Sequence, residues 1–321
     1  MSQAVGRRPR AAVPLQDRVA RIAAWPPRAA HQEEAISALE QGEVVCLPKL
    51  AFPLLDGEEA LLDPQLCDGR SKNISFDPST GRLGGLNTDD LRALLVRRLM
   101  ERFSAWSLAT ARQLLPAYAG ALQLARTSLR PCEIENRAIS PRKDDRRLHV
   151  DAFPANPVQG RRILRLFANV DPEGRPRVWN VGEPFEPFAT RFLPRAGRAI
   201  PGAAAAMQVL KLTKGRRTAY DHAMLRLHDL AKEDGVYQET AIRRRIDFDS
   251  GTTWMVFTDA TLHAALEGRN VLEQTFLLPC GAMVDPAMSP LKILERLTGR
   301  ELLPPPTRQR RREGDRRPRS A

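Results

Sequence analysis

The chain has 321 residues, of which 42% are hydrophobic and 27% are charged. This length and composition predict a large folded core and exclude a mainly disordered protein. The formal net charge is +12, but it is concentrated at the two ends: residues 1–28 hold six basic and one acidic side chain, and residues 304–321 hold seven and two. The body is nearly neutral. The charge therefore predicts solubility, or attraction to an anionic leaflet, rather than nucleic-acid binding, for which interleaved aromatic and basic residues are missing.

Cysteine spacing and hydropathy indicate where the protein works. The four cysteines include no Cys-x-x-Cys pair, which argues against a disulfide framework or a structural zinc site and is typical of the reducing cytoplasm: Cys46, Cys67, Cys132 and Cys280. No run approaches the roughly 18 apolar residues of a membrane-spanning helix. Pro14 and Asp17 interrupt the apolar run that a signal peptide needs. We expect a cytoplasmic protein without a transmembrane segment, in peripheral contact at most with the cytoplasmic face of the inner membrane.

These patterns divide the chain into a basic lead that is expected to be disordered, one folded domain, and a disordered tail rich in proline and arginine: residues 1–30, 31–303 and 304–321. In the first half of the domain the apolar spacing predicts a helix, a strand, a long helix and an extended segment, at residues 32–41, 42–48, 87–121 and 122–135.

The second half of the domain alternates mainly with the period of strands. Strands are predicted at residues 146–154, 160–172, 252–258 and 271–278, and helices at residues 221–233 and 290–297. Between residues 172 and 250 lies a long insert whose first part is rich in proline. A hairpin-rich β architecture follows, with helices covering an outer face.

The strongest candidate site is the triplet His149-Val-Asp151 together with the distant His263. Residues two apart on a strand project from the same face, so His149 and Asp151 would share one space. A histidine from a second strand would complete a facial triad of two histidines and one carboxylate, which leaves open positions on iron(II). The alternative is a pair of half-buried histidines that bond to the backbone. The strand pattern around both histidines favours the metal site.

The residues around this triplet resemble the Kdo 3-hydroxylases, which are iron(II)/2-oxoglutarate-dependent dioxygenases. The resemblance runs from about His31 to Leu303 and is carried by three segments: Arg142-Lys-Asp-Asp to Asn169-Val-Asp-Pro172, within it Leu148-His-Val-Asp-Ala-Phe-Pro154, and the later Leu272-Glu-Gln-Thr-Phe276.

Membership of that family implies a mainly β fold with flanking helices around a double-stranded β-helix, the jelly roll that cupins share. It implies that His149, Asp151 and His263 hold Fe(II), with 2-oxoglutarate and O2 as cosubstrates. It also implies hydroxylation at C3 of 3-deoxy-D-manno-octulosonic acid in the lipid A inner core of lipopolysaccharide. The expected partner is therefore an anionic glycolipid.

The cation that would hold the far carboxylate of 2-oxoglutarate is not where many of these dioxygenases have it. About ten residues beyond the distal histidine, an arginine is usual, but Glu273 stands there. Alternation instead places Arg165 on one face of the strand after His-x-Asp, and arginine binds carboxylates through two parallel hydrogen bonds. Arg165 is the preferred clamp. Further candidates for contacts to the cosubstrate are Arg162, Arg269, Thr275 and Asn169.

A group of basic residues before the triplet is the candidate cradle for an acidic, lipid-linked sugar: Arg126, Arg130, Arg142 and Lys143. The alternative is a solvated charged loop balanced by Asp144 and Asp145.

Three other functions compete with sugar hydroxylation. A related dioxygenase could act on protein or nucleic acid. A zinc hydrolase would use similar ligands, but the sequence has no His-Glu-x-x-His motif. A non-enzymatic, cupin-like binding protein would share the fold without turnover.

Overall fold

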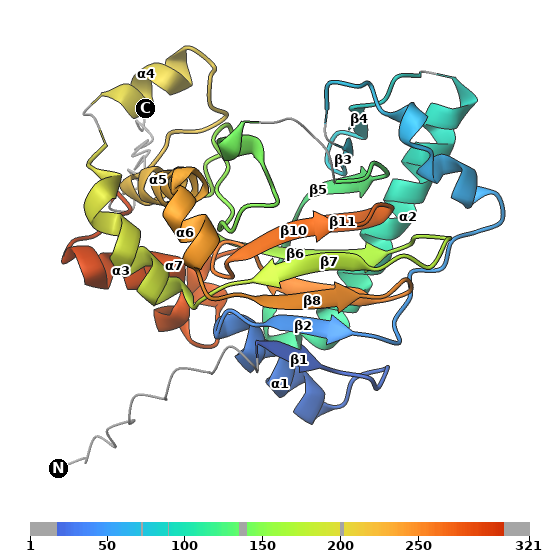
Figure 1. The fold of residues 1–321 in the computed structure, drawn as a ribbon, viewed down its shortest axis with the longest axis horizontal. Coiled ribbons are helices and arrows are strands. Elements are labelled where there is room, and N and C mark those ends of the chain that lie inside the picture. The colour runs from blue at the N-terminus through green and yellow to red at the C-terminus, as the bar shows by residue number, and fades with distance from the viewer. Residues whose placement is uncertain (1–17, 72, 89, 135–139, 200–201, 305–321) are drawn as a thin grey trace, which may run out of the picture.

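The computed structural model describes residues 18–71, 73–88, 90–134, 140–199 and 202–304. Within these residues it contains two β-sheets (Figure 1). The larger sheet has the strand order β1-β2-β9-β6-β11-β5-β3-β4: Val19–Arg21, Val44–Leu47, Thr253–Phe257, Arg162–Asn169, Val271–Leu278, Gln123–Arg130, Ile74–Asp77 and Arg82–Gly84. The smaller sheet has the order β10-β7-β8: His263–Glu267, Arg177–Val181 and Arg244–Phe248.

The two sheets pack face to face through an aromatic cluster. Trp254 on β9 stacks on Phe248 of β8 at 4.1 Å between ring centroids, and Trp179 of β7 meets Trp254 edge-on at 5.7 Å. Every strand pairs with its neighbours in antiparallel register except β1 with β2, which is parallel. Two facing, largely antiparallel sheets that close over a common interior form a jelly roll. The fold class expected from the sequence is confirmed.

Helices cover the other face of the larger sheet and one end of the molecule (Figure 1). Helix α1 packs against β2, and α2 packs against β5 and β11, while α3 contacts both α5 and α7. The helices are α1 to α7: Ala29–Glu40, Leu91–Leu114, Phe185–Ala196, Ala203–Val209, Ala219–Glu233, Gly235–Thr240 and Pro290–Thr298. None of the helices in the described part of the chain has the length and apolarity to cross a bilayer.

One expectation needs correction, and another was incomplete. Residues 18–30 are not disordered: β1 pairs with β2, and the buried Arg18 donates a hydrogen bond to the carbonyl of Gly42 at 2.6 Å. In the insert 172–250, where the sequence predicted a helix at 221–233, the structure adds β7, β8 and three further helices. The remaining part of the basic lead and nearly all of the tail lie outside the described residues.

A buried ion pair fixes β6 to the end of β9. Arg162 is fully buried, donates to the Asp259 carboxylate at 2.7 Å and stacks over the Phe257 ring at 3.9 Å. Burial raises the pKa of Asp259 more than the Arg162 guanidinium lowers it. This pair is structural, because the two residues interact with each other inside the core and neither faces the cavity.

Removing one partner of this pair is expected to be costly. Asp259→Ala should lower the free energy of unfolding by about 3–5 kcal/mol, because it strands the Arg162 charge in the core. Urea denaturation measures the loss. The double variant Arg162→Met with Asp259→Leu should recover most of it. Asp247→Ala removes a carboxylate from an exposed pair with Arg245 and should leave the midpoint unchanged. A loss below about 1 kcal/mol for Asp259→Ala would contradict the structural role.

Candidate metal centre

The two histidines of the candidate triad face each other across a single β-bridge. The His149 amide donates to the His263 carbonyl at 3.0 Å, and the His263 amide donates back at 2.9 Å. His263 begins β10, but His149 lies in a loop, so the strand predicted at residues 146–154 is reduced to this one bridge. The Asp151 amide donates to the Thr258 carbonyl at 2.8 Å. Backbone hydrogen bonds on both sides of Val150 thus fix where the two side chains start.

Backbone carbonyls also orient both imidazoles. Nδ1 of His149 lies 2.7 Å from the carbonyl of Arg147, and Nδ1 of His263 lies 2.9 Å from the carbonyl of Thr261. A carbonyl only accepts, so each Nδ1 carries the proton and each Nε2 presents a lone pair. Metal-binding histidines usually donate their other nitrogen to such a partner. The arrangement is that of two ligands already in the right tautomer.

The protonation states of the triad also suit metal binding. Burial lowers the pKa of both histidines, and for His149 the neighbouring His263 adds to this effect. Burial alone would raise the pKa of Asp151, but Arg165 and the two histidines hold it below its ordinary value. The site therefore offers two neutral imidazoles and one carboxylate, which is the form that metals bind.

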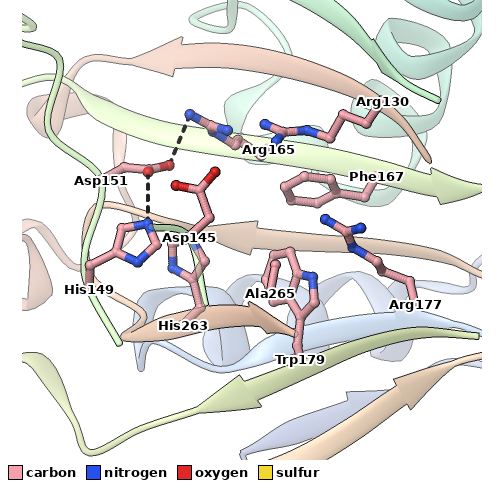
Figure 2. Close-up of a pocket in the computed structure, with 10 residues that line it drawn as sticks. All are labelled: Arg130, Asp145, His149, Asp151, Arg165, Phe167, Arg177, Trp179, His263 and Ala265. Atoms are coloured by element: carbon pink, nitrogen blue, oxygen red, sulfur yellow. Dashed lines mark ion pairs between the residues drawn. The ribbon is translucent and has the colours of Figure 1, made fainter. Parts of the chain in front are cut away.

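Candidate ligand atoms of His149, Asp151 and His263 all lie within 4.8 Å of one another. In Figure 2 these three side chains point toward one another from the loop and from β10. Two nitrogen donors and one oxygen donor on one side of a cavity match the facial triad of non-haem iron(II) oxygenases. The residues present therefore fit Fe(II).

A cavity of about 130 Å³ opens beside the triad, between the two sheets (Figure 2). This volume is well below the roughly 300–1,000 Å³ of pockets that enclose a drug-sized ligand. The cavity suits a small ligand. Its lining residues are Arg130, Asp145, His149, Asp151, Arg165, Phe167, Arg177, Trp179, His263 and Ala265.

A chain of ion pairs crosses neighbouring strands and ends at the triad. Arg130 of β5 donates to Glu273 of β11 through Nε and Nη2 at 2.9 and 2.5 Å. Arg165 of β6 donates to the other oxygen of Glu273 at 2.7 Å and lies 3.0 Å from Asp151. Glu273 thus stands at the position where a clamping arginine is expected from the sequence, and it holds two arginines instead. Arg165 fixes the carboxylate of Asp151.

Arg177 of β7 lines the cavity and makes no ion pair with a described residue, although the charges of three carboxylates act on it and raise its pKa: Glu133, Asp145 and Glu273. Its Nη1 donates to the Gly268 carbonyl at 2.6 Å, and its buried Nε has no hydrogen-bond partner. Among the residues that the structure describes, no carboxylate forms an ion pair with it. Burial and then the Arg130 guanidinium lower the pKa of Arg177 to about 9. It stays protonated at neutral pH, and an anion in the cavity would relieve its unfavourable position.

The other expected cosubstrate contacts do not line the cavity. Arg162 belongs to the core pair with Asp259. Arg269 pairs with Glu173 and Asp171 near the surface. The Asn169 amide donates to the carbonyls of Arg175 and Phe248, and the Thr275 hydroxyl lies 3.3 Å from Glu273. None of these four residues lines the cavity, and the bonds named here hold their side chains to the scaffold.

Of the basic residues proposed as a sugar cradle, Arg130 alone lines the cavity. Arg126, Arg142 and Lys143 are exposed, and Arg142 donates to Glu233 of α5 at 2.5 Å. The structure does not bring the four together at the site.

The sequence interpretation missed Asp145, Phe167, Arg177, Trp179 and Ala265 as lining residues. Trp179 stacks on His263 at 5.1 Å between ring centroids and forms one wall beside Arg177. A signal for both was present, because Arg177-Val-Trp-Asn-Val181 contains two β-branched residues and a tryptophan between Pro176 and Gly182, as a short strand does.

The family model for 3-deoxy-D-manno-oct-2-ulosonic acid (Kdo) hydroxylase matches residues 23–301. No curated protein matches the chain.

Solved structures of the Kdo hydroxylase KdoO, a non-haem Fe(II) α-ketoglutarate-dependent dioxygenase, are similar over nearly their full length. The complex with cobalt(II) is 43% identical, with 89% of this chain and 98% of that chain covered and a TM-score of 0.87. The complex with α-ketoglutarate and Fe(III) is 42% identical, with 89% and 97% covered and a TM-score of 0.85.

Proposed function

The chain belongs to the Kdo hydroxylase family, and from that premise we propose that it hydroxylates C3 of 3-deoxy-D-manno-octulosonic acid (Kdo) in the inner core attached to lipid A. The enzyme is an Fe(II)/2-oxoglutarate-dependent dioxygenase. The observation that carries the proposal is the cluster of His149, Asp151 and His263 beside a small cavity lined by Arg177, an arginine that pairs with no carboxylate of the described residues.

In this proposal His149, Asp151 and His263 would hold Fe(II). The metal and 2-oxoglutarate supply the oxidation that a C–H bond requires, and the protein supplies orientation and a dry site. The carbonyls of Arg147 and Thr261 keep the imidazoles in the binding tautomer. Trp179 and Phe167 exclude water from the inner wall of the cavity.

We assign the far carboxylate of 2-oxoglutarate to Arg177 rather than to Arg165. Arg165 already pairs with Asp151 and Glu273, so its charge is shared twice. Arg177 is buried and lines the same cavity, and it forms no ion pair with a carboxylate of the described residues. Arg165 positions the metal-binding carboxylate in this assignment, and Arg130 is the retained candidate for contact with the acidic sugar.

The size of the cavity bears on the acceptor. Because about 130 Å³ suits a small acid, the sugar would bind at the open side, where its lipid stays outside the protein. We propose peripheral contact with an anionic membrane as the way in which the enzyme reaches this acceptor.

Purified enzyme tests the function directly. With Fe(II), 2-oxoglutarate, O2 and detergent-dispersed Kdo-lipid A, we expect one succinate for each acceptor that gains one oxygen atom at C3, as read by mass spectrometry with fragmentation. His263→Ala serves as the inactive control. Lipopolysaccharide from cells without the gene should lack the added oxygen. If a protein or nucleic acid stimulates succinate formation and Kdo-lipid A does not, the proposed acceptor is wrong.

A further inference from the structure

A stretch without any acidic residue runs from within α3 to the start of α5. From Pro187 to Tyr220 the sequence contains no Asp or Glu. It contains seven basic residues: Arg191, Arg195, Arg198, Lys211, Lys214, Arg216 and Arg217. Arg195 pairs with Asp234 at 2.7 Å, and the other six basic residues leave the stretch strongly basic. A basic stretch of this kind attracts an anionic partner.

At the end of α4 this stretch presents apolar side chains to solvent. Val209, Leu210 and Leu212 are 80%, 67% and 63% exposed, and Lys211 between them is also exposed. We call residues 209–212 the tip. In Figure 1, α4 lies at the upper left edge, beyond α3 and α5 and away from the sheets. Three large apolar side chains exposed within four residues mark an interaction site rather than the scattered exposure of ordinary surfaces.

Hydrogen bonds hold the tip in shape. The Leu210 amide donates to the Ala206 carbonyl at 2.9 Å, and the Leu212 amide donates to the Met207 carbonyl at 2.9 Å. These bonds close the end of α4 and leave the apolar side chains outside. The exposure is therefore built into a folded turn.

The chain after the tip is fixed to the segment that carries a metal ligand. The Lys214 amide donates to the Ala155 carbonyl at 2.9 Å, and Nε2 of Gln159 donates to the Arg216 carbonyl at 3.0 Å. Arg217 donates to the Pro154 carbonyl. Pro154 is three residues from Asp151. A surface that engages the tip is thereby placed at a fixed position relative to the cavity.

We propose that the tip inserts into the interfacial layer of an anionic leaflet, with Lys211, Lys214 and Arg216 at the level of the lipid phosphates. An exposed apolar end beside a segment that contains cations and no carboxylate is what such a layer binds. The carboxylate of Asp77, from β3, interacts with Lys214, whereas Lys211 and Arg216 form no ion pair with a carboxylate of the described residues. Two copies of the tip carry the same charge and repel each other, which disfavours a dimer through this face. The inference rests on the proposed function, because a lipid-linked acceptor is what gives membrane contact a role.

Vesicle sedimentation with the full chain tests the proposal. Vesicles of phosphatidylcholine with phosphatidylglycerol should bind the protein, and vesicles of phosphatidylcholine alone should bind it much less. The triple variant Val209→Ser, Leu210→Ser and Leu212→Ser should weaken binding on the order of tenfold or more. Lys211→Ala with Lys214→Ala should weaken it by a similar factor, and added salt should remove that difference.

A matched control uses exposed apolar residues elsewhere. Val236 and Ile242 are 71% and 70% exposed, and Val236→Ser with Ile242→Ser should leave vesicle binding unchanged. The tip variants should keep the native unfolding midpoint and the native rate on detergent-dispersed acceptor, because no tip residue lines the cavity.

The outcomes separate this inference from the proposed function, since vesicle binding needs no acceptor. If the triple variant binds anionic vesicles with native affinity, the proposal that the tip inserts into the leaflet is wrong. If the triple variant loses self-association in the ultracentrifuge but keeps vesicle binding, the tip is an interface between copies of the chain and the membrane proposal is wrong. If vesicle binding depends on the tip but the enzyme leaves Kdo-lipid A unchanged, the membrane role of the tip is supported and the proposed acceptor is wrong.

Discussion

Alanine at His149, Asp151 or His263 is expected to abolish hydroxylation and to remove most Fe(II) binding. Each residue contributes one donor atom to a cluster whose members all lie within 4.8 Å. Losing a ligand should cost more than the roughly 10- to 100-fold in affinity that follows loss of an outer partner. Metal content after anaerobic equilibrium dialysis measures the effect, with cobalt(II) as a redox-inert second probe.

Control variants distinguish a lost ligand from a damaged fold. His222→Ala changes a partly buried histidine of α5 that does not belong to the cluster, and it should leave metal content unchanged. The three ligand variants should keep far-ultraviolet circular dichroism close to the native spectrum, because backbone bonds hold the bridge between residues 149 and 263. Full activity of Asp151→Ala, without added halide or carboxylate, would remove Asp151 from the coordination shell.

The sequence predicted those parts of the molecule that depend on local periodicity. The strand predicted at residues 271–278 is β11, and the helix predicted at 221–233 is α5 with two more residues at its start. Alternation also predicted that Arg165 and Arg162 project from opposite faces of the strand. In the structure Arg165 faces the cavity and Arg162 faces the core. A period of two determines the face of a strand residue, but it does not say whether both faces are buried. Here both are.

The rest of the site depends on contacts between distant segments. Glu273 was interpreted as a missing clamp, since its spacing from His263 is all that the sequence displays. Its contacts with Arg130 and Arg165 require the order β5-β11-β6, in which residues diagonal to each other across strands meet. No local pattern contains that order.

Arg177 was missed for a different reason. The prolines at 172, 176, 184 and 187 made its surroundings resemble an irregular insert. Within them β7 is only five residues long, yet it pairs with both β8 and β10. Partners on both sides stabilise a strand that would be too short to persist alone.

Arg177→Ala is expected to raise the dissociation constant for 2-oxoglutarate by roughly ten- to a hundredfold, since a charge-assisted contact contributes about 1.5–3 kcal/mol. Calorimetric titration of the cobalt(II)-loaded protein measures this without turnover. Arg177→Lys should recover only part of the affinity, because lysine keeps the charge but not the planar fork. Affinity for the metal should stay native, as Arg177 has no contact with Asp151 in the ion-pair chain.

Arg165→Ala should give the opposite pattern, and the contrast decides between the two arginines. Arg165 lies 3.0 Å from Asp151, so its loss frees the carboxylate and should weaken metal binding first. Arg269→Ala, which alters a pair with Glu173 away from the cavity, should leave both constants unchanged. If Arg165→Ala weakens 2-oxoglutarate binding at saturating metal while Arg177→Ala is silent, Arg165 is the clamp that strand alternation predicted. In that case the unpaired charge of Arg177 must serve the acidic sugar, and its alanine variant should instead raise the constant for the acceptor.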